Sequence, residues 1–357
     1  MSREVRRGRQ NKAIPTGSRM MPSPSALKLL DLIQSHRVTA VIYVAAKLGI
    51  AELLRDGPRS LDELAKATGA DRQSLRRLLA ALSTIGICSL PGENCYSLTE
   101  MGVGLDGSVG QSLKGWAIFE GEMLSKSWNG MLESVMTGKT AAQLLGLSNS
   151  FDLMARSPES VSIFNAAMAD LTRLVIPDVL RAYDFTGIAH LMDVGGGSGE
   201  LIGAVVKEYP HMRATVFDLP RCGGAANSHL IRIGVSDRAR FLAGNFFEAV
   251  PAIADAIVLK SVIHDWDDAR SGTILRNCHQ ALPAEGTLIL VERIMPESPF
   301  AGNENKAHAM SDLNMLRGPG GLERTENEYR HLLGDNGFSL MSIVPAGRFS
   351  VIEARAS

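Results

Sequence analysis

The stretch HLMDVGGGSGE at residues 190–200 decides the fold. Three apolar residues, Leu191, Met192 and Val194, lead into a run of glycines, and a helix-like segment follows. This order of strand, glycine turn and helix is typical of α/β folds that bind nucleotides, because glycine lets a ligand approach backbone N–H groups and the helix N-terminus. The glycine spacing is GxGxG. Glu200 stands where the dinucleotide pattern GxGxxG needs glycine, which disfavours an NAD-dependent oxidoreductase.

The next apolar run, RATVFDL at residues 213–219, carries an acid, Asp218, next to its last residue. Its distance along the chain from the glycine turn is about that expected for a carboxylate that binds ribose hydroxyls. The glycine turn and Asp218 together predict a ligand of the nucleoside type.

Apolar runs alternate with helix-like stretches from residue 186 onward. The predicted strands are HLMDV, ATVFDL, RFLAG, AIVLK, TLILVE, FSLMSIV and RFSVIEA. This alternation predicts a parallel, doubly wound sheet, and the short PAG link between the last two runs predicts an antiparallel pair at its edge. Ligands of such sheets bind at the carboxyl ends of the strands. Those ends carry Asp218, Asn245, Lys260, His264 and Glu292.

The segment LKSVIHDWDD contains the strongest catalytic candidate, His264, just past a predicted strand. An unperturbed imidazole has a pKa of about 6.5, which suits a general base near neutral pH. Against a phenol of pKa ~10 the deficit is about 3.5 units, or ~5 kcal/mol. A carboxylate behind the ring would reduce this cost by stabilising the imidazolium. Glu292 and Glu323 are the candidates for that carboxylate.

Two other chemistries are disfavoured. Asp265, Asp267 and Asp268 form an acidic cluster, but adjacent carboxylates on one loop more often cap a helix than bind a metal, and we predict no metal requirement. A serine hydrolase is disfavoured because the chain has no G-x-S-x-G motif.

Composition limits the remaining classes. The 357 residues carry a formal net charge of −1, so nothing global favours nucleic acid or an anionic membrane as a partner, and no run approaches the length of a membrane span. The four cysteines lack CxxC or zinc spacing and are typical of reduced thiols, which indicates a cytoplasmic protein.

We expect four regions along the chain. Residues 1–24 are basic and form a disordered tail, and residues 25–105 form helices followed by a hairpin, as in a winged helix. Such a module binds DNA or serves packing and dimerisation, and the near-neutral charge favours dimerisation. Residues 106–185 form a helical linker whose Phe164 and Met168 face one way and are candidates for an acceptor pocket. Residues 186–357 form the catalytic domain.

Seven motifs of the chain occur in the same order as in the S-adenosylmethionine-dependent small-molecule O-methyltransferases, a family that the chain resembles. This family includes the plant caffeate and flavonoid enzymes, the acetylserotonin enzymes and the bacterial enzymes that act on aromatic polyketides. The resemblance covers about residues 30–355. Its motifs are DVGGGSG, FDLP, GNFFE, LKSVIHDWDD, LVERIMP, DLNML and GGLERTENEY. It implies a doubly wound, Rossmann-like methyltransferase sheet, a winged-helix dimerisation domain and a homodimer whose partner subunit often lines the acceptor site.

The resemblance also implies residue roles. Gly195 and Gly197 would lie at the methionine end of the cofactor, Asp218 at its ribose, Leu219, Asn245 and Phe246 at its adenine, and Lys260 near it. His264 would be the base with Glu292 and Glu323 beside it, and Phe164, Met168 and Met315 would line the acceptor pocket. The family commonly has Asp where this chain has Asn245, which lacks the charge and brings donor groups.

The implied reaction is an in-line displacement in which an acceptor oxygen attacks the sulfonium methyl group while His264 takes the proton. The acceptor would be an aromatic small molecule, most simply a phenol, of unknown identity and regiochemistry. An N- or C-methyltransferase on the same fold is the nearest alternative. A winged-helix regulator with a ligand-sensing domain is a more distant one.

Overall fold

The computed structural model describes residues 23–147, 150–151, 157–298 and 305–357. The chain divides into two compact units, Met1–Val38 and Thr39–Ser357. Within the described part, none of the helices is both long enough and apolar enough to cross a membrane.

Helix α1 (Pro24–Gln34) belongs to the first unit. It begins at a proline preceded by Ser23, whose hydroxyl accepts a hydrogen bond from the backbone of Ala26. None of its residues is buried, and its leucines are about half exposed. Helix α2 (His36–Lys47) crosses the boundary between the two units.

The second unit begins with short helices around a three-stranded sheet of order β1-β3-β2. Its elements are α3 (Ile50–Leu54), β1 (Arg59–Ser60), α4 (Leu61–Thr68), α5 (Arg72–Thr84), β2 (Cys88–Gly92) and β3 (Cys95–Leu98). Ser60 and Glu63 form a reciprocal capping box at the start of α4. Leu75, Leu79 and Leu82 of α5 are buried in the core of this region. The helices and the final hairpin that the sequence predicts here are therefore present.

Helices connect this region to the large sheet. They are α6 (Glu100–Val103), α7 (Lys114–Phe119), the π-helix η1 (Glu120–Leu124), α8 (Ser125–Trp128), α9 (Met131–Thr137), α10 (Ala141–Leu144) and α12 (Pro158–Ala182). Helix α12 has Pro177 in its interior. Because proline has no backbone N–H, the carbonyl of Arg173 cannot receive a helical bond from residue 177.

The large sheet has seven strands in the order β11-β12-β8-β7-β4-β5-β6. The strands are β4 (His190–Val194), β5 (Arg213–Asp218), β6 (Ala239–Ala243), β7 (Ala256–Lys260), β8 (Thr287–Glu292), β11 (Phe338–Ala346) and β12 (Phe349–Ala356). The first five pair in parallel, whereas β12 runs antiparallel to β8 and β11 antiparallel to β12. The predicted doubly wound α/β sheet with a final antiparallel pair is confirmed.

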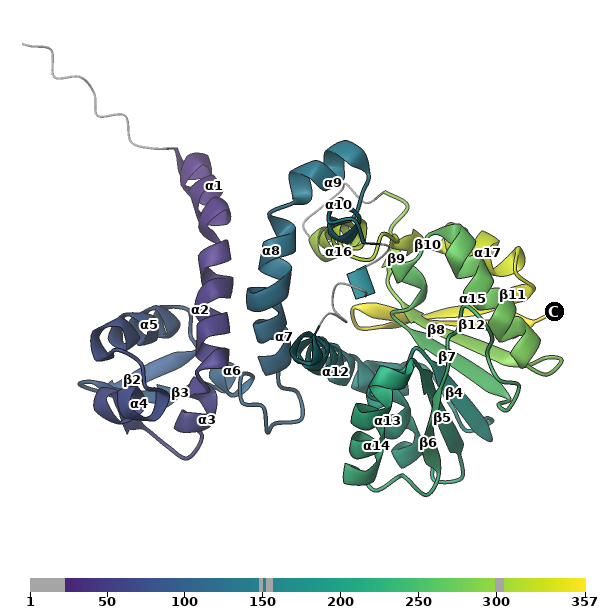
Figure 1. The fold of residues 1–357 in the computed structure, drawn as a ribbon, viewed down its shortest axis with the longest axis horizontal. Coiled ribbons are helices and arrows are strands. Elements are labelled where there is room, and N and C mark those ends of the chain that lie inside the picture. Colours follow the sequence, from purple (N-terminus) through teal and green to yellow (C-terminus); the bar gives the residue numbers. More distant parts are fainter. Residues whose placement is uncertain (1–22, 148–149, 152–156, 299–304) are drawn as a thin grey trace, which may run out of the picture. The chain divides into compact units, whose positions relative to one another are not determined.

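Helices cover both faces of this sheet (Figure 1). They are α12, α13 (Glu200–Glu208), α14 (Gly223–Arg232), α15 (Asp268–Ala281) and α17 (Glu326–Gly334). Helix α16 (Lys306–Arg317) instead contacts α9. The short elements are η2 (Pro220–Cys222), η3 (Ile263–Asp265), β9 (Ile294–Met295) and β10 (Arg324–Thr325). Strand β4 shows how the faces divide. Met192 and Val194 join the core with α15 and α17, and Leu191 joins the core with α12, α13 and α14.

Candidate active site

A cavity of about 320 Å³ opens at the carboxyl ends of β4, β5 and β7, the edge where the sequence predicts a ligand. The glycine turn after β4 forms part of its wall. Gly195 and Gly197 have φ angles of 76° and 56°, which favour glycine. A Cβ atom on Gly195 would lie 2.8 Å from Val262, and one on Gly197 would meet nothing within 4 Å. The backbone of Gly197 is therefore open to the cavity.

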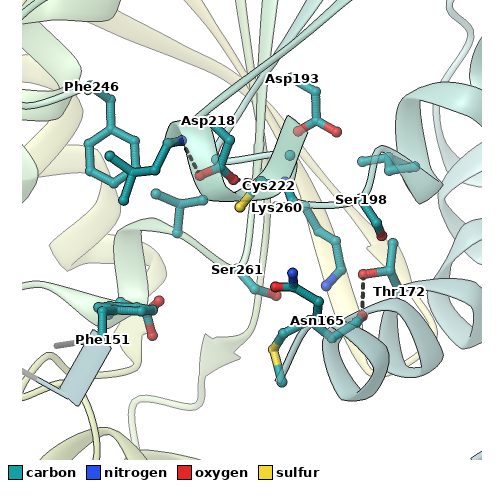
Figure 2. Close-up of a pocket in the computed structure, with 18 of the residues that line it drawn as sticks. Phe151, Asn165, Thr172, Asp193, Ser198, Asp218, Cys222, Phe246, Lys260 and Ser261 are labelled. Carbon is teal, nitrogen blue, oxygen red and sulfur yellow. Dashed lines mark hydrogen bonds between the residues drawn. The ribbon is translucent and has the colours of Figure 1, made fainter. Parts of the chain in front are cut away.

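Asp218 lies at the end of β5 and holds this turn. Its Oδ2 accepts a hydrogen bond from the backbone N–H of Gly197 at 2.8 Å, and its Oδ1 accepts one from Leu219 at 2.6 Å. Figure 2 shows Asp218, Lys260 and Ser198 around the same cavity. Each carboxylate oxygen has a second lone pair, so Asp218 can also accept from a diol in the cavity.

Two ionisable side chains, the buried Asp193 and the half-buried Lys260, line the cavity together with the glycine turn. Burial, reinforced by the negative charge of Asp218, raises the pKa of Asp193 to about 7. Burial lowers the pKa of Lys260 to about 8, against the attraction of Glu292 and Asp193.

Asn245 lies on the loop after β6 and lines the cavity together with Leu219 and Phe246. Its side-chain amide donates to Oε1 of Glu248 at 3.0 Å, and its side-chain oxygen accepts from the backbone N–H of Phe247 at 3.1 Å. The amide is thereby oriented, and its oxygen keeps one lone pair for a ligand.

His264 is 8% exposed and has carboxylates on both sides of its ring. Nδ1 lies 3.2 Å from Oε1 of Glu323 and 3.6 Å from Oε2 of Glu292, and Nε2 lies 3.6 Å from Oδ1 of Asp265. Glu292 is fixed because its Oε1 accepts from the backbone N–H groups of Val262 and Ile263, both at 2.9 Å. The structure thus brings together the histidine and both glutamates that the sequence singles out.

These carboxylates change the basicity of His264. Burial alone would lower the pKa of the imidazole, but the charges of Glu292 and Glu323 outweigh it and raise the pKa to about 10. Burial likewise raises the pKa of Asp265 to about 7, although His264 opposes the rise. The ordinary imidazole pKa assumed from the sequence therefore does not hold in the folded chain, where a proton on His264 is stabilised.

The predicted acceptor residues divide into two groups. Phe164 and Met168 of α12 line the cavity. Met315 of α16 is 5% exposed and is not among the described residues that line it, so its contact with an acceptor remains a prediction. His264 itself does not line the cavity, whereas the adjacent Asp265 does.

Several cavity residues are missed by the sequence analysis, and the most informative is Trp266. Its ring stacks on Phe151 at 5.5 Å with an interplanar angle of 29°, and it meets Phe247 edge-on at 4.8 Å. Phe151 in turn meets Phe164 edge-on at 6.1 Å. The residues missed include Phe151, Asn165, Thr172, Asp193, Ser198, Cys222, Phe247, Asp265 and Trp266. The position of Trp266 two residues after His264 is the one signal that could have identified it.

The acidic cluster after β7 separates in the structure. Asp265 is beside His264, Asp267 caps α15 by accepting from the backbone of Arg270 at 2.9 Å, and Asp268 pairs with Arg324 at 2.8 Å. In the part of the chain that is described, no three His, Cys, Asp or Glu side chains are grouped so that they could hold a metal ion.

Comparison with known proteins gives matches across both regions. The model of the O-methyltransferase domain matches residues 128–339, and that of the O-methyltransferase dimerisation domain matches residues 30–105. The chain is similar to the phenazine O-methyltransferase PhzM of Lysobacter antibioticus, with 38% identity over 335 residues that cover 93% of this chain and 96% of that protein. It is also similar to the 8-amino-8-demethylriboflavin N,N-dimethyltransferase of Streptomyces davaonensis, with 32% identity over 353 residues, or 95% of this chain and 99% of that one.

A solved structure shares the fold and shows a bound cofactor. It is an O-methyltransferase from neocarzinostatin biosynthesis in complex with S-adenosylmethionine and 2-hydroxy-5-methyl naphthoic acid. The TM-score is 0.73 at 29% identity, and the match covers 90% of this chain and 96% of that one. With the domain match above, these similarities show that the chain belongs to the family of S-adenosylmethionine-dependent O-methyltransferases.

Proposed function

We propose that this enzyme methylates a hydroxyl group of an aromatic small molecule, with His264 as the general base. The observation that carries the proposal is the buried imidazole of His264, which has Glu292 and Glu323 at Nδ1 and lies next to Asp265 of the cavity wall. A base is what a hydroxyl acceptor needs, because its oxygen must lose a proton as it forms the new bond.

The cavity fits S-adenosylmethionine. Gly195 and Gly197 line it where the methionine end would lie, with the backbone of Gly197 open, and Asp218 has free lone pairs for the ribose hydroxyls. Leu219, Asn245 and Phe246 would hold the adenine, and Lys260 would lie near the cofactor. Bound there, S-adenosylmethionine would supply an electrophilic methyl group.

The raised pKa of His264 changes where the free-energy cost of proton transfer arises. Transfer of a proton from a phenol of pKa ~10 to an ordinary imidazole is unfavourable by about 5 kcal/mol. With a pKa of about 10, His264 matches the phenol. The cost appears instead as a small fraction of neutral imidazole at pH 7, so turnover should rise with pH.

The acceptor would lie against α12. Phe164 and Met168 line the cavity there, and the stacked pair of Phe151 and Trp266 adds flat apolar surface. Such walls suit an aromatic ring and exclude water. The phenazine, riboflavin and naphthoic acid in the names of the similar proteins support a fused-ring acceptor, and we include Met315 in its pocket.

Methylation of an aromatic amine is the second candidate, because one similar protein is named an N,N-dimethyltransferase. We favour oxygen because an amine nitrogen can attack through its lone pair before it loses a proton, so it needs His264 less.

We further propose a homodimer, no metal requirement and a cytoplasmic location. The match to the dimerisation domain supports the dimer, and the four free cysteines support a reducing compartment. We retain the division into a tail (1–24), a dimerisation domain (25–105), an acceptor-pocket segment (106–185) and a catalytic domain (186–357). Equal turnover with and without a chelator would support the metal-free proposal.

The test is turnover with labelled S-adenosylmethionine on pairs of fused-ring acceptors that differ only in carrying a hydroxyl or an amino group. His264→Ala should abolish hydroxyl methylation and leave the affinity for S-adenosylhomocysteine, measured by calorimetry, unchanged. His331→Ala is the matched control, because His331 is exposed on α17. Near-normal turnover in His264→Ala, or a preference of the unmodified enzyme for the amine, would overturn the proposal.

A further inference from the structure

Arg324 follows Glu323 directly and is among the most deeply buried side chains, with 1% exposed. It begins strand β10, which pairs in parallel with β9 so that Arg324 lies opposite Ile294. Glu323, the residue just before this strand, reaches the ring of His264, whereas the side chain of Arg324 reaches the backbone around it.

The guanidinium of Arg324 binds the backbone on both sides of His264. Nη1 donates to the carbonyl of Ile263 at 3.1 Å, and Nη2 donates to the carbonyl of Trp266 at 2.8 Å. Nη2 also reaches Oγ of Ser271 at 3.3 Å, and Nε donates to Oδ1 of Asp268 at 3.0 Å. One side chain thus spans the short turn η3 that carries His264.

Two further contacts hold the same turn. The hydroxyl of Ser271 donates to the carbonyls of Ile263 and Trp266, both at 3.2 Å. On the chain segment that carries Arg324, a Cβ atom at Gly321 would lie only 2.1 Å from the carbonyl oxygen of His264. The segment 321–324 is therefore packed directly against the backbone of the proposed base.

An ion pair does not account for this arrangement. Among the described residues, the carboxylate paired with Arg324 is that of Asp268, whose side chain is 76% exposed, and an ion pair in contact with water adds little. Burial of a guanidinium is itself unfavourable. What arginine offers that lysine does not is a rigid planar fork that can bind two carbonyls at once.

We propose that Arg324 is a positioning residue that fixes His264 through its flanking carbonyls while Glu323 fixes the imidazole ring. This inference rests on the proposed role of His264 as the base. Two consecutive residues then support the same histidine: Arg324, at the start of β10, holds its backbone, and Glu323, just before that strand, holds its ring.

The test is Arg324→Lys in the full-length enzyme, which keeps the charge and removes the fork. We expect kcat to fall by about 10- to 100-fold at both pH 7 and pH 10, as is usual when support for a reacting group is lost. The affinity for S-adenosylhomocysteine and the acceptor KM should change less than twofold. The midpoint of the pH–rate profile should also fall, because a displaced imidazole leaves the carboxylates that hold its proton.

Arg276→Lys is the matched control. Arg276 of α15 donates to Oδ1 of Asn336 at 2.7 Å and to Thr273 at 3.2 Å, away from the turn. This variant should keep the kcat and the pH profile of the unmodified enzyme even if its unfolding temperature falls. An Arg324→Lys variant with unchanged kcat and pH profile would overturn the inference. A kcat loss without any shift of the pH midpoint would also overturn it, because a loss of stability alone would produce that result.

If Arg324→Lys fails to fold, Ser271→Ala decides the question, because it removes only one small hydroxyl from the turn. Its kcat should fall by about 3- to 10-fold, in line with a lost hydrogen bond, with the midpoint again lower; an unchanged profile would refute the inference. The variant His264→Ala separates the two proposals. If it retains normal turnover, the proposed function fails; if it is inactive while Arg324→Lys is normal, only the role of Arg324 fails.

Discussion

Replacement of Glu323 by Gln tests the base most sharply, because its effect should depend on pH. The change removes the charge that lies 3.2 Å from Nδ1 of His264 but keeps an oxygen that can accept the same hydrogen bond. A hydrogen bond to a charged group is worth about 1.5–3 kcal/mol and a neutral one about 1 kcal/mol. The imidazolium should therefore lose about 1.4 kcal/mol of stabilisation, which lowers the pKa of His264 by about one unit.

The loss of rate in Glu323→Gln should be visible only at high pH. At pH 7, below the pKa of about 10, the resting enzyme already carries the imidazolium, so Glu323 stabilises the resting and transition states alike. At pH 10 half of the imidazole is neutral, and the charge then favours the transition state alone. For a pKa shift of about one unit, Glu323→Gln should be about fivefold slower than the unmodified enzyme at pH 10 and within twofold of it at pH 7.

The assay is single-turnover methyl transfer at saturating cofactor for both enzymes across pH 6.5–10. Because both enzymes use the same acceptor, the ratio of their rates does not depend on the ionisation of that acceptor. Calorimetry with S-adenosylhomocysteine shows whether the cofactor site is intact. An equal loss at both pH values would mean that Glu323 acts on structure rather than on proton transfer, and no loss at pH 10 would mean that it does not support the base.

Four further outcomes are expected. In the unmodified enzyme kcat/KM should rise about tenfold per pH unit between pH 7 and 9, because the neutral form of a group of pKa about 10 is required; a flat profile would contradict this. The same raised pKa means that protonated His264 stabilises the fold fully below pH 6.5, and this contribution is lost as the pH rises through 10. Between pH 6.5 and 10 the unfolding temperature should therefore fall less steeply in His264→Gln than in the unmodified protein. Asp218→Asn should weaken S-adenosylhomocysteine binding by at least about tenfold, as a charge-assisted bond is lost, and calorimetry showing equal affinity would remove Asp218 from the ribose site. Asn245→Asp combined with Glu248→Gln, which removes the carboxylate that would repel the new one, should tighten the same binding by about 3- to 10-fold relative to Glu248→Gln alone, since a charged acceptor replaces a neutral one; weaker binding would count against the adenine contact.

The sheet and its glycine turn could be predicted because their signals are local. Each apolar run of the sequence becomes a strand, and the acid near the end of RATVFDL becomes the residue that holds the turn, Asp218. Periodicity and the end of a strand are properties of neighbouring residues, so one sequence is enough to show them.

The electrostatics of the site could not be predicted because they depend on residues far apart in the chain. Glu292 and Glu323 follow His264 by 28 and 59 residues, and only folding brings both to Nδ1. The basicity of His264 results from this convergence together with burial. The three nearby aspartates show the same limit, since the turn η3 sends Asp265 to the base while its neighbours cap or pair at α15.

The proline inside α12 has a consequence for how new acceptor ranges could arise. The turns of α12 before Arg173 carry Phe164 and Met168 in the cavity, whereas Val179 beyond Pro177 is fully buried against the sheet. The hydrogen-bond ladder is interrupted between these two halves. Substitutions at the cavity-lining positions 164, 165, 168 and 172 of the first half therefore leave the buried residues of the second half unchanged. A library confined to these four positions keeps the buried Ala167 and Asp170, so it should explore new ring systems while most of its members still fold.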